Sequence, residues 1–149
     1  MVNGQRGSAA SATWSSSVKI WLPPCGFAAL ILLFSSTPGS YFPEHPNFLN
    51  NAVHFLEFCV LAFLLARTLR YRYSLSRTGL FLWTIAICAS FGFLDEAHQF
   101  LVPERVFDLA DLLIDTIGAA VGTTIFIFST TFKTKDSHKG SAASGDING

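Results

Sequence analysis

The stretch LFLWTIAICASFGFLDEAHQFL, residues 80–101, decides the fold. It is about as long as the roughly 20 residues that cross a bilayer, and most of it is apolar. Only its last part is polar, with two acids, a histidine and a glutamine. Three further blocks of the chain are also apolar and of similar length. We therefore predict an all-α membrane protein, a bundle of four transmembrane helices at about residues 20–36, 48–69, 79–101 and 108–132.

The composition agrees with a membrane protein. The chain of 149 residues is 50% hydrophobic and only 13% charged, whereas soluble domains are about one quarter charged. Ten basic and ten acidic residues cancel, so no charge excess favours nucleic acid as a partner. Cys25, Cys59 and Cys88 lie in apolar blocks and are odd in number. We interpret them as small hydrophobic residues rather than as disulfides or metal ligands.

Small polar residues dominate both ends of the chain. Residues 1–19 and 133–149 lack an apolar period, so we expect disordered tails around a transmembrane domain of residues 20–132. The first apolar block also resembles a signal peptide, because a short apolar run follows a polar start. The SSTPGS after it has no clean small-x-small cleavage site. We therefore expect a retained helix.

Basic side chains gather on one side of the predicted bundle. The connection at residues 37–47 has neither lysine nor arginine, and Arg105 is the one basic residue of the connection at 102–108. By the positive-inside rule these two connections are outside, and both tails are cytoplasmic. The basic residues of the second connection and the C-terminal tail are Arg67, Arg70, Arg72, Arg77, Lys133, Lys135 and Lys139.

Ionisable side chains enter the apolar blocks on the outer side. A rise of 1.5 Å per residue puts Asp115 roughly 10 Å deeper than Asp108, and His54 lies about as far below the start of its helix. Three helices therefore present polar faces at one depth. Spacings of three, four or seven residues place them on shared faces: His54 and Glu57 on the second helix, Asp95, His98 and Gln99 on the third, and Asp108, Asp111 and Asp115 on the fourth.

The energetics favour a common site for these groups. A carboxylate deep in a transmembrane helix costs about 2.5–3.5 kcal/mol, whereas a leucine contributes only about 0.3–0.6 kcal/mol. We therefore expect the acids to face one another across a polar cavity that opens outward. Glu96 points nearly opposite to His98, and we interpret it as a solvated residue at the interface. Gly118 and Gly122 continue the acidic stripe as a small-xxx-small pattern, which predicts close helix packing.

With these residues the chain resembles the VanZ-like family of small bacterial membrane proteins, over about residues 25–130. Four segments carry the resemblance: ILLFSSTP at 31–38, HFLEF at 54–58, DEAHQFLVPER at 95–105 and DLLIDTIGAAVG at 111–122. The resemblance implies a multi-pass protein of the bacterial plasma membrane. It also implies a link to glycopeptide resistance, teicoplanin in particular, through the member that names the family. The family pattern carries over to His54, Glu57, Asp95, Glu96, Gln99, Arg105, Asp111 and Gly118.

The chain also departs from the family pattern. An acid and a lysine are usual where Asn50 and Asn51 stand. A tyrosine is usual at Phe58, a glycine at Glu104 and an asparagine at Asp115. These changes remove a cation and add carboxylates, so details of ligand chemistry do not transfer.

The first functional hypothesis is an outer site that binds or modifies an anionic envelope component, with Arg105 as a forked donor to phosphate or carboxylate. His54 or His98 could act as general base, oriented by Glu57 or Asp95. A divalent metal ion is an open option, since imidazole and carboxylate suit several such ions, but no HExxH motif is present. The candidate catalytic residues are His54, Glu57, Asp95 and His98, and the candidate binding residues are Glu96, Gln99, Arg105, Asp108, Asp111 and Asp115.

Other functions stay open. In a structural or accessory subunit, the same polar groups only hold the helices together, with Arg105 paired to Asp108 or Asp111. A small transporter or proton relay is less favoured, because four short helices leave little room for alternating access. No Gly-rich phosphate loop, G-x-S-x-G elbow or CxxC motif supports a soluble enzyme. The expected partners are membrane lipids, an envelope precursor or glycopeptide-like ligand, and further copies of the chain.

Overall fold

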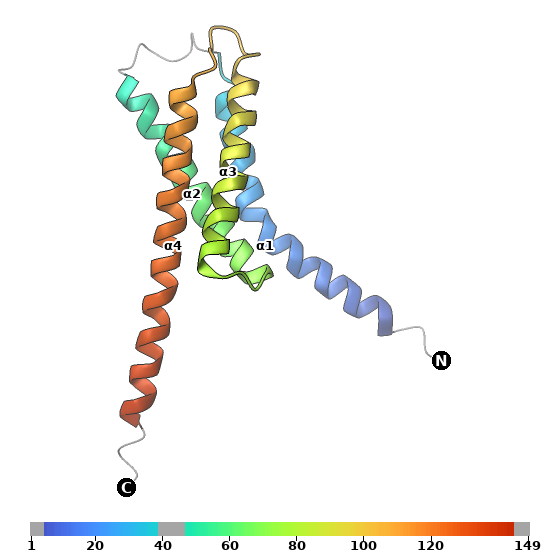
Figure 1. The fold of residues 1–149 in the computed structure, drawn as a ribbon. Coiled ribbons are helices and arrows are strands. Elements are labelled where there is room, and N and C mark those ends of the chain that lie inside the picture. The colour runs from blue at the N-terminus through green and yellow to red at the C-terminus, as the bar shows by residue number, and fades with distance from the viewer. Residues whose placement is uncertain (1–4, 39–46, 145–149) are drawn as a thin grey trace.

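The computed structural model describes the main chain of residues 5–38 and 47–144, and the side chains of residues 18–38 and 48–131. Each of its helices contains a segment long and apolar enough to cross a membrane. The predicted all-α bundle of four transmembrane helices is thus confirmed. The helices are α1 (Gln5–Ser35), α2 (Asn47–Arg72), α3 (Arg77–Gln99) and α4 (Leu109–Ser144), as Figure 1 shows.

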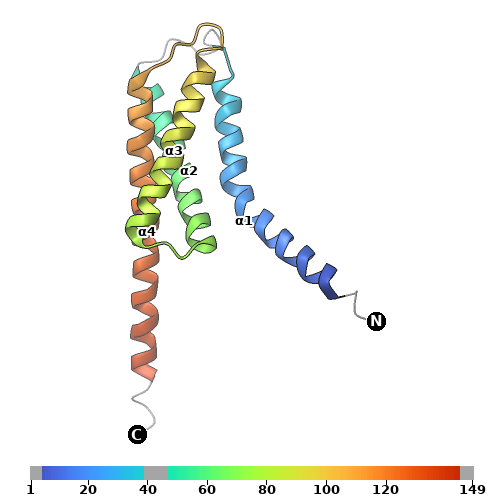
Figure 2. The same cartoon turned by 45° about the vertical axis from the view of Figure 1, so that its right-hand side comes forward.

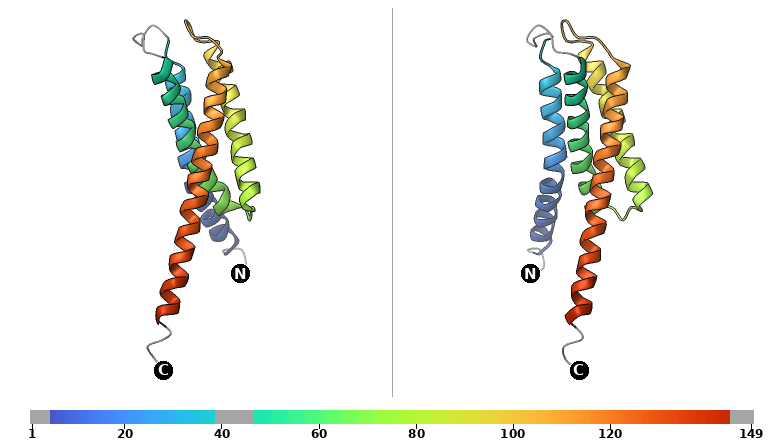
Figure 3. Two further views of the ribbon diagram at one scale, coloured as in Figure 1. Left: turned by 60° about the vertical axis from the view of Figure 1, so that its left-hand side comes forward. Right: turned by 90° about the vertical axis from the view of Figure 1, so that its left-hand side faces the viewer.

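The helices run alternately up and down, so that α1 begins and α4 ends on the side of the α2–α3 connection (Figure 1). Helices α2 and α3 each contact the other three helices. The interface between α2 and α4 is the most extensive, and α3 packs against both α2 and α4. Figure 3 shows α1 on the side of α2 away from α4. The sequence-based expectation that both chain ends and the arginine-rich connection share one side agrees with this arrangement.

Side-chain caps define where two helices begin. The Ser76 hydroxyl accepts a hydrogen bond from the Gly79 amide at 3.1 Å, at the start of α3. The Asp108 carboxylate accepts one from the Ala110 amide at 2.7 Å, at the start of α4. Each bond satisfies an amide that has no partner within its own helix.

Helices α1 and α4 extend further than the predicted spans. They include residues 5–19 and 133–144, which we expected to belong to disordered tails. Residues 133–144 contain no proline, so nothing there forbids the hydrogen bonds that continue α4. Its last part reaches beyond the other helices (Figure 3). The ends of the expected tails, residues 1–4 and 145–149, lie outside the described residues.

Helix α1 bends along its length, and its first part turns away from the bundle (Figure 2). Pro23 and Pro24 lie inside this helix. A proline removes one helical hydrogen bond, and its ring clashes with the preceding turn. The two prolines account for the bend.

Helices α2 and α4 approach closely because glycines line their contact. A Cβ atom on Gly118 would collide with the carbonyl oxygen of Phe55, and one on Gly122 with that of Cys59. A Gly122 Cβ would also lie 2.8 Å from the Cys59 carbonyl carbon. The GAAVG segment therefore rests directly on the main chain of α2, which is the small-residue packing found between membrane helices.

Apolar side chains cover much of the outside of the bundle. Leu33, Leu82 and Leu113, from three different helices, are each at least 60% exposed. Water would disfavour this surface, whereas lipid tails match it. The polar side chains described next are instead turned inward.

Candidate functional site

A group of polar side chains is buried where α2 and α4 begin and α1 and α3 end, at the upper end of the bundle in Figure 1. Their exposed fractions lie between 0% and 8%. We call this group the polar cluster. It consists of His54 from α2, Asp95, Glu96 and Gln99 from α3, and Asp111 and Asp115 from α4.

His54 is held between two acids of α4. Its Nδ1 lies 3.2 Å from Asp115 Oδ1, within hydrogen-bonding distance. Its Nε2 lies 3.8 Å from Asp111 Oδ2, which also accepts a hydrogen bond of 3.2 Å from the Asn50 amide. The sequence suggested Glu57 or Asp95 as the group that orients a histidine. For His54 that role belongs to Asp115, because the glycine contact brings α4 close to α2.

Asp95 joins α3 to α1. Its Oδ2 accepts hydrogen bonds from the Ser35 hydroxyl at 2.8 Å and from the Gln99 amide at 3.0 Å. Its Oδ1 is buried and has no hydrogen-bond partner. Two of the predicted site residues, Asp95 and Gln99, are therefore in direct contact.

Glu96 is buried, so its interpretation as a solvated interfacial residue was wrong. Its exposed fraction is 0%, and its Oε2 accepts a hydrogen bond of 2.9 Å from the Asp108 amide. Helix α3 contacts both α1 and α4, so more than one face of α3 meets protein. Glu96 faces α4, and His98 faces α1.

His98 and Glu57 lie beside the polar cluster. His98 is half-buried, and its Nε2 is 2.9 Å from the hydroxyl of Ser36, the residue directly after α1. The same hydroxyl donates to the Leu32 carbonyl at 2.6 Å, so the His98 ring is the donor to Ser36. Glu57 is half-buried and close enough to His54, Asp95 and Asp115 to interact with them electrostatically.

The α3–α4 connection closes this end of the bundle. Asp108 is exposed, and its side chain caps α4, while its amide binds Glu96. Arg105 is half-buried in the same connection. Glu104 has a φ of 63°, a left-handed conformation that favours glycine. This conformation is compatible with the glycine that the resemblance led us to expect at this position.

A VanZ/LLP1 family model matches residues 6–131, which is most of the chain. The chain belongs to the VanZ-like family. No curated protein and no solved structure matches this VanZ-like chain significantly. The family match and the four apolar helices together show a VanZ-like membrane protein.

The polar side chains of this VanZ-like protein meet in direct contact. The sequence led us to expect an open polar cavity between them. Among the described residues, a hydrogen bond from Ser35 to Asp95 joins α1 to α3. Helices α2 and α4 are joined by the contact of His54 with Asp115 and by the hydrogen bond from Asn50 to Asp111. The glycine-mediated approach of α4 to α2 accompanies this packing, and the acids of the cluster are at most 8% exposed.

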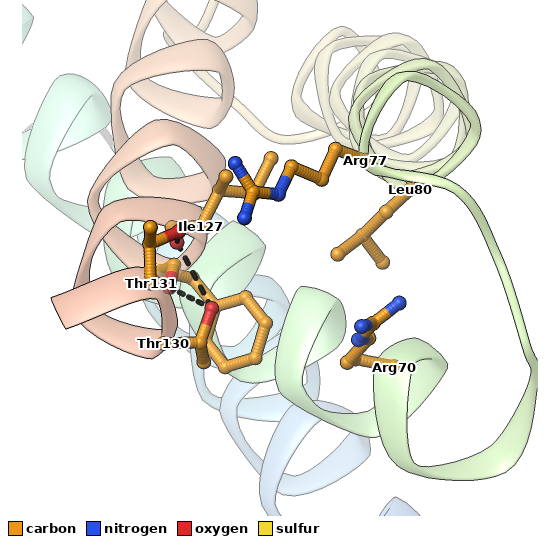
Figure 4. A pocket seen from close by; sticks show the side chains of 7 residues that line it. Arg70, Arg77, Leu80, Ile127, Thr130 and Thr131 are labelled. Atoms are coloured by element: carbon orange, nitrogen blue, oxygen red, sulfur yellow. Dashed lines mark hydrogen bonds between the residues drawn. The ribbon is translucent and has the colours of Figure 1, made fainter. Parts of the chain in front are cut away.

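A pocket of about 100 Å³ lies at the opposite end of the VanZ-like bundle, between α2, α3 and α4 (Figure 4). Arg70 and Arg77 line one side of it, and Thr130 and Thr131 the other. Arg70 Nη1 also donates a hydrogen bond of 2.7 Å to the Leu75 carbonyl. This pocket holds none of the predicted site residues.

Several residues of the polar region were not predicted as site residues. Ser35 and Ser36 bind Asp95 and His98, and their position at the end of an apolar run was the available signal. Asn50 binds Asp111 from the first turns of α2. Gly92 had no sequence signal: a Cβ there would lie 3.1 Å from Asp115 Oδ2. Its lack of a side chain makes room for that carboxylate.

Proposed function

We propose that this VanZ-like protein acts in the bacterial plasma membrane, with both tails in the cytoplasm and the polar cluster at the outer face. There it binds or modifies an anionic component of the cell envelope and thereby changes sensitivity to glycopeptide antibiotics. One observation carries this proposal. Three helices bring an imidazole and four buried carboxyl groups together at one depth of an otherwise apolar bundle. Intramembrane ionisable groups are costly and usually functional.

The distribution of basic residues supports the orientation. Arg70, Arg72 and Arg77 lie around the α2–α3 connection, at the end opposite the polar cluster. Arginine is enriched on the cytoplasmic side of membrane proteins. The cluster then faces the compartment in which envelope precursors and glycopeptides meet.

The connection that covers the cluster provides the group suited to an anion. Arg105 lies three residues before Asp108, whose amide binds Glu96. A guanidinium presents paired N–H groups that match phosphate and carboxylate oxygens. In this proposal Arg105 holds the head group, and His54, oriented by Asp115, transfers a proton if a reaction follows.

The test uses a bacterium that lacks its own VanZ-like protein. We expect expression of the chain to raise the inhibitory concentration of teicoplanin. His54→Gln, Asp95→Asn and Arg105→Gln should each abolish the rise at unchanged membrane abundance. Ser90→Ala, on the exposed side of α3, is the matched control and should behave as wild type. An unchanged teicoplanin response on expression of the wild type, or full activity in all three variants, would reject the proposal.

A structural role is the second candidate, because the acids already have protein partners. Ser35 and Gln99 bind Asp95, and Asn50 binds Asp111. Such contacts between membrane helices contribute about 0.6 kcal/mol each on average. If this is their only role, the three variants lower abundance or melting temperature in proportion to any loss of antibiotic response. Measuring abundance beside sensitivity separates the two functions.

A further inference from the structure

Three side chains from three helices converge within the polar cluster. His54 of α2, Glu96 of α3 and Asp111 of α4 each offer one ligand atom, and these atoms lie within 4.8 Å of one another. All three residues are buried. Ligands at about 2.0–2.2 Å from a tetrahedral ion are about 3.3–3.6 Å apart. The 3.8 Å between His54 Nε2 and Asp111 Oδ2 is close to that separation.

The hydrogen bond to Asp115 prepares the ring of His54 to be a ligand. An ionised carboxylate can only accept, so Asp115 Oδ1 places the proton on Nδ1. In the neutral ring the other nitrogen, Nε2, then carries a lone pair, and it lies 3.8 Å from Asp111 Oδ2. A carboxylate that binds the far nitrogen of a ligating histidine is the usual support of a metal site, because it sets the tautomer and the ring orientation.

Glu96 supplies an independent sign of a missing ligand. It is fully buried, and its Oε2 binds the Asp108 amide, but its Oε1 has no hydrogen-bond partner. A buried carboxylate oxygen without a partner carries a large desolvation cost. A cation bound beside His54 and Asp111 would remove this cost.

The charge balance points the same way. Asp95, Glu96, Asp111 and Asp115 are at most 8% exposed, and Glu57 adds a further acid nearby. Among the described residues at this end, His54, His98 and Arg105 supply at most three positive charges. A divalent cation would offset the remaining excess of carboxylates in a medium where uncompensated charge is costly.

We propose that His54 Nε2, a Glu96 carboxylate oxygen and Asp111 Oδ2 bind one divalent metal ion, Zn²⁺ or Mn²⁺, with Asp115 as the positioning residue for His54. One imidazole and two carboxylates form a mixed nitrogen and oxygen donor set. This set suits Zn²⁺ and Mn²⁺ better than it suits Mg²⁺ and Ca²⁺, which prefer oxygen ligands only. Three protein ligands leave a coordination position for water or for an oxygen of an anionic ligand. Metal binding goes beyond the proposed function. Because a bound metal ion would occupy the lone pair of His54 Nε2, His54 could transfer a proton only in the metal-free protein, whereas anion binding by Arg105 is compatible with both states.

The test is metal binding by the full-length protein, purified in detergent and stripped with a chelator that is then removed. Zn²⁺ and Mn²⁺ are added separately, and bound metal is counted by mass spectrometry while affinity is measured by titration calorimetry. We expect about one equivalent of at least one of these ions, little Mg²⁺ or Ca²⁺, and a higher melting temperature with metal. Antibiotic sensitivity plays no part, so failure here leaves the proposed function standing, and the reverse also holds.

Isosteric variants locate the site. Glu96→Gln, Asp111→Asn and His54→Gln should each abolish stoichiometric binding, and Asp115→Asn should weaken it by about 10–100-fold. His98→Gln and Asp108→Asn are the matched controls, because they alter a histidine and an acid at the same end outside the three ligands. Asparagine also keeps the α4 cap. Less than half an equivalent of both ions on the wild type would overturn the proposal. So would wild-type affinity in Glu96→Gln and Asp111→Asn, or an equal loss in the two controls.

Discussion

Asp115 Oδ1 on α4 lies 3.2 Å from His54 Nδ1 on α2, and both side chains are almost fully buried. This contact joins the two helices that share the largest interface. It also decides which nitrogen of His54 faces Asp111. The contact therefore links the stability of the bundle to the chemistry of the polar cluster.

Removing the Asp115 carboxylate should destabilise the protein. Asp115→Ala leaves the buried His54 ring without its hydrogen-bond partner, at a cost of about 1–3 kcal/mol. Asp115→Asn keeps an acceptor and should cost less. Thermal unfolding in detergent with a chelator present measures both, so that bound metal does not contribute. A melting temperature of Asp115→Ala at or above that of the wild type would contradict this role.

The contact between α4 and α2 should not tolerate a methyl group at Gly122. A Cβ there collides with the main chain of Cys59, which cannot rotate away as a side chain can. We expect Gly122→Ala to lower the free energy of unfolding by about 1–3 kcal/mol. Gly26→Ala is the control, because no atom lies within 4 Å of its added Cβ. Equal melting temperatures for the two variants would show that α2 and α4 can move apart at little cost in free energy.

The main chain at Glu104 should favour glycine. Its φ of 63° costs a residue with a side chain about 1–2 kcal/mol. Glycine avoids this steric cost, but it recovers only part of the stability because it loses more conformational entropy when the chain folds. We expect Glu104→Gly to raise the stability by about 0.5–1 kcal/mol, whereas Glu104→Ala changes it little. Chemical denaturation in micelles gives both values. A loss of stability in Glu104→Gly would argue against the left-handed conformation.

The proposed orientation predicts which connections reach the outside of the cell. Val106 is 75% exposed in the α3–α4 connection, and Ser74 is exposed in the α2–α3 connection. In a variant with the three native cysteines replaced by alanine, Val106→Cys should react with an impermeant maleimide in intact cells. Ser74→Cys should react only after permeabilisation. The opposite pattern would place the polar cluster on the cytoplasmic side and reject the proposed function.

The sequence predicted which residues belong to the polar region better than it predicted their partners. Helical spacing placed His54, Asp95, Asp111 and Asp115 at one depth, and the structure brings them together. The same spacing assigned Glu96 to solvent, because a single helix does not reveal how many neighbours surround it. It also proposed Glu57 as the group that orients His54, because only contacts within one helix can be inferred from spacing.

The amino-acid sequence by itself determined the four membrane-spanning helices and the end of the bundle where polar groups gather. Hydropathy and helical periodicity are properties of single segments, so they need no knowledge of the neighbours. Only the tertiary structure decided that Asp115 binds His54, that Glu96 is buried, and that Asp95 binds Ser35 and Gln99. These outcomes depend on how closely and at what rotation the helices pack. Glycines at 92, 118 and 122 set that packing through the side chains they lack.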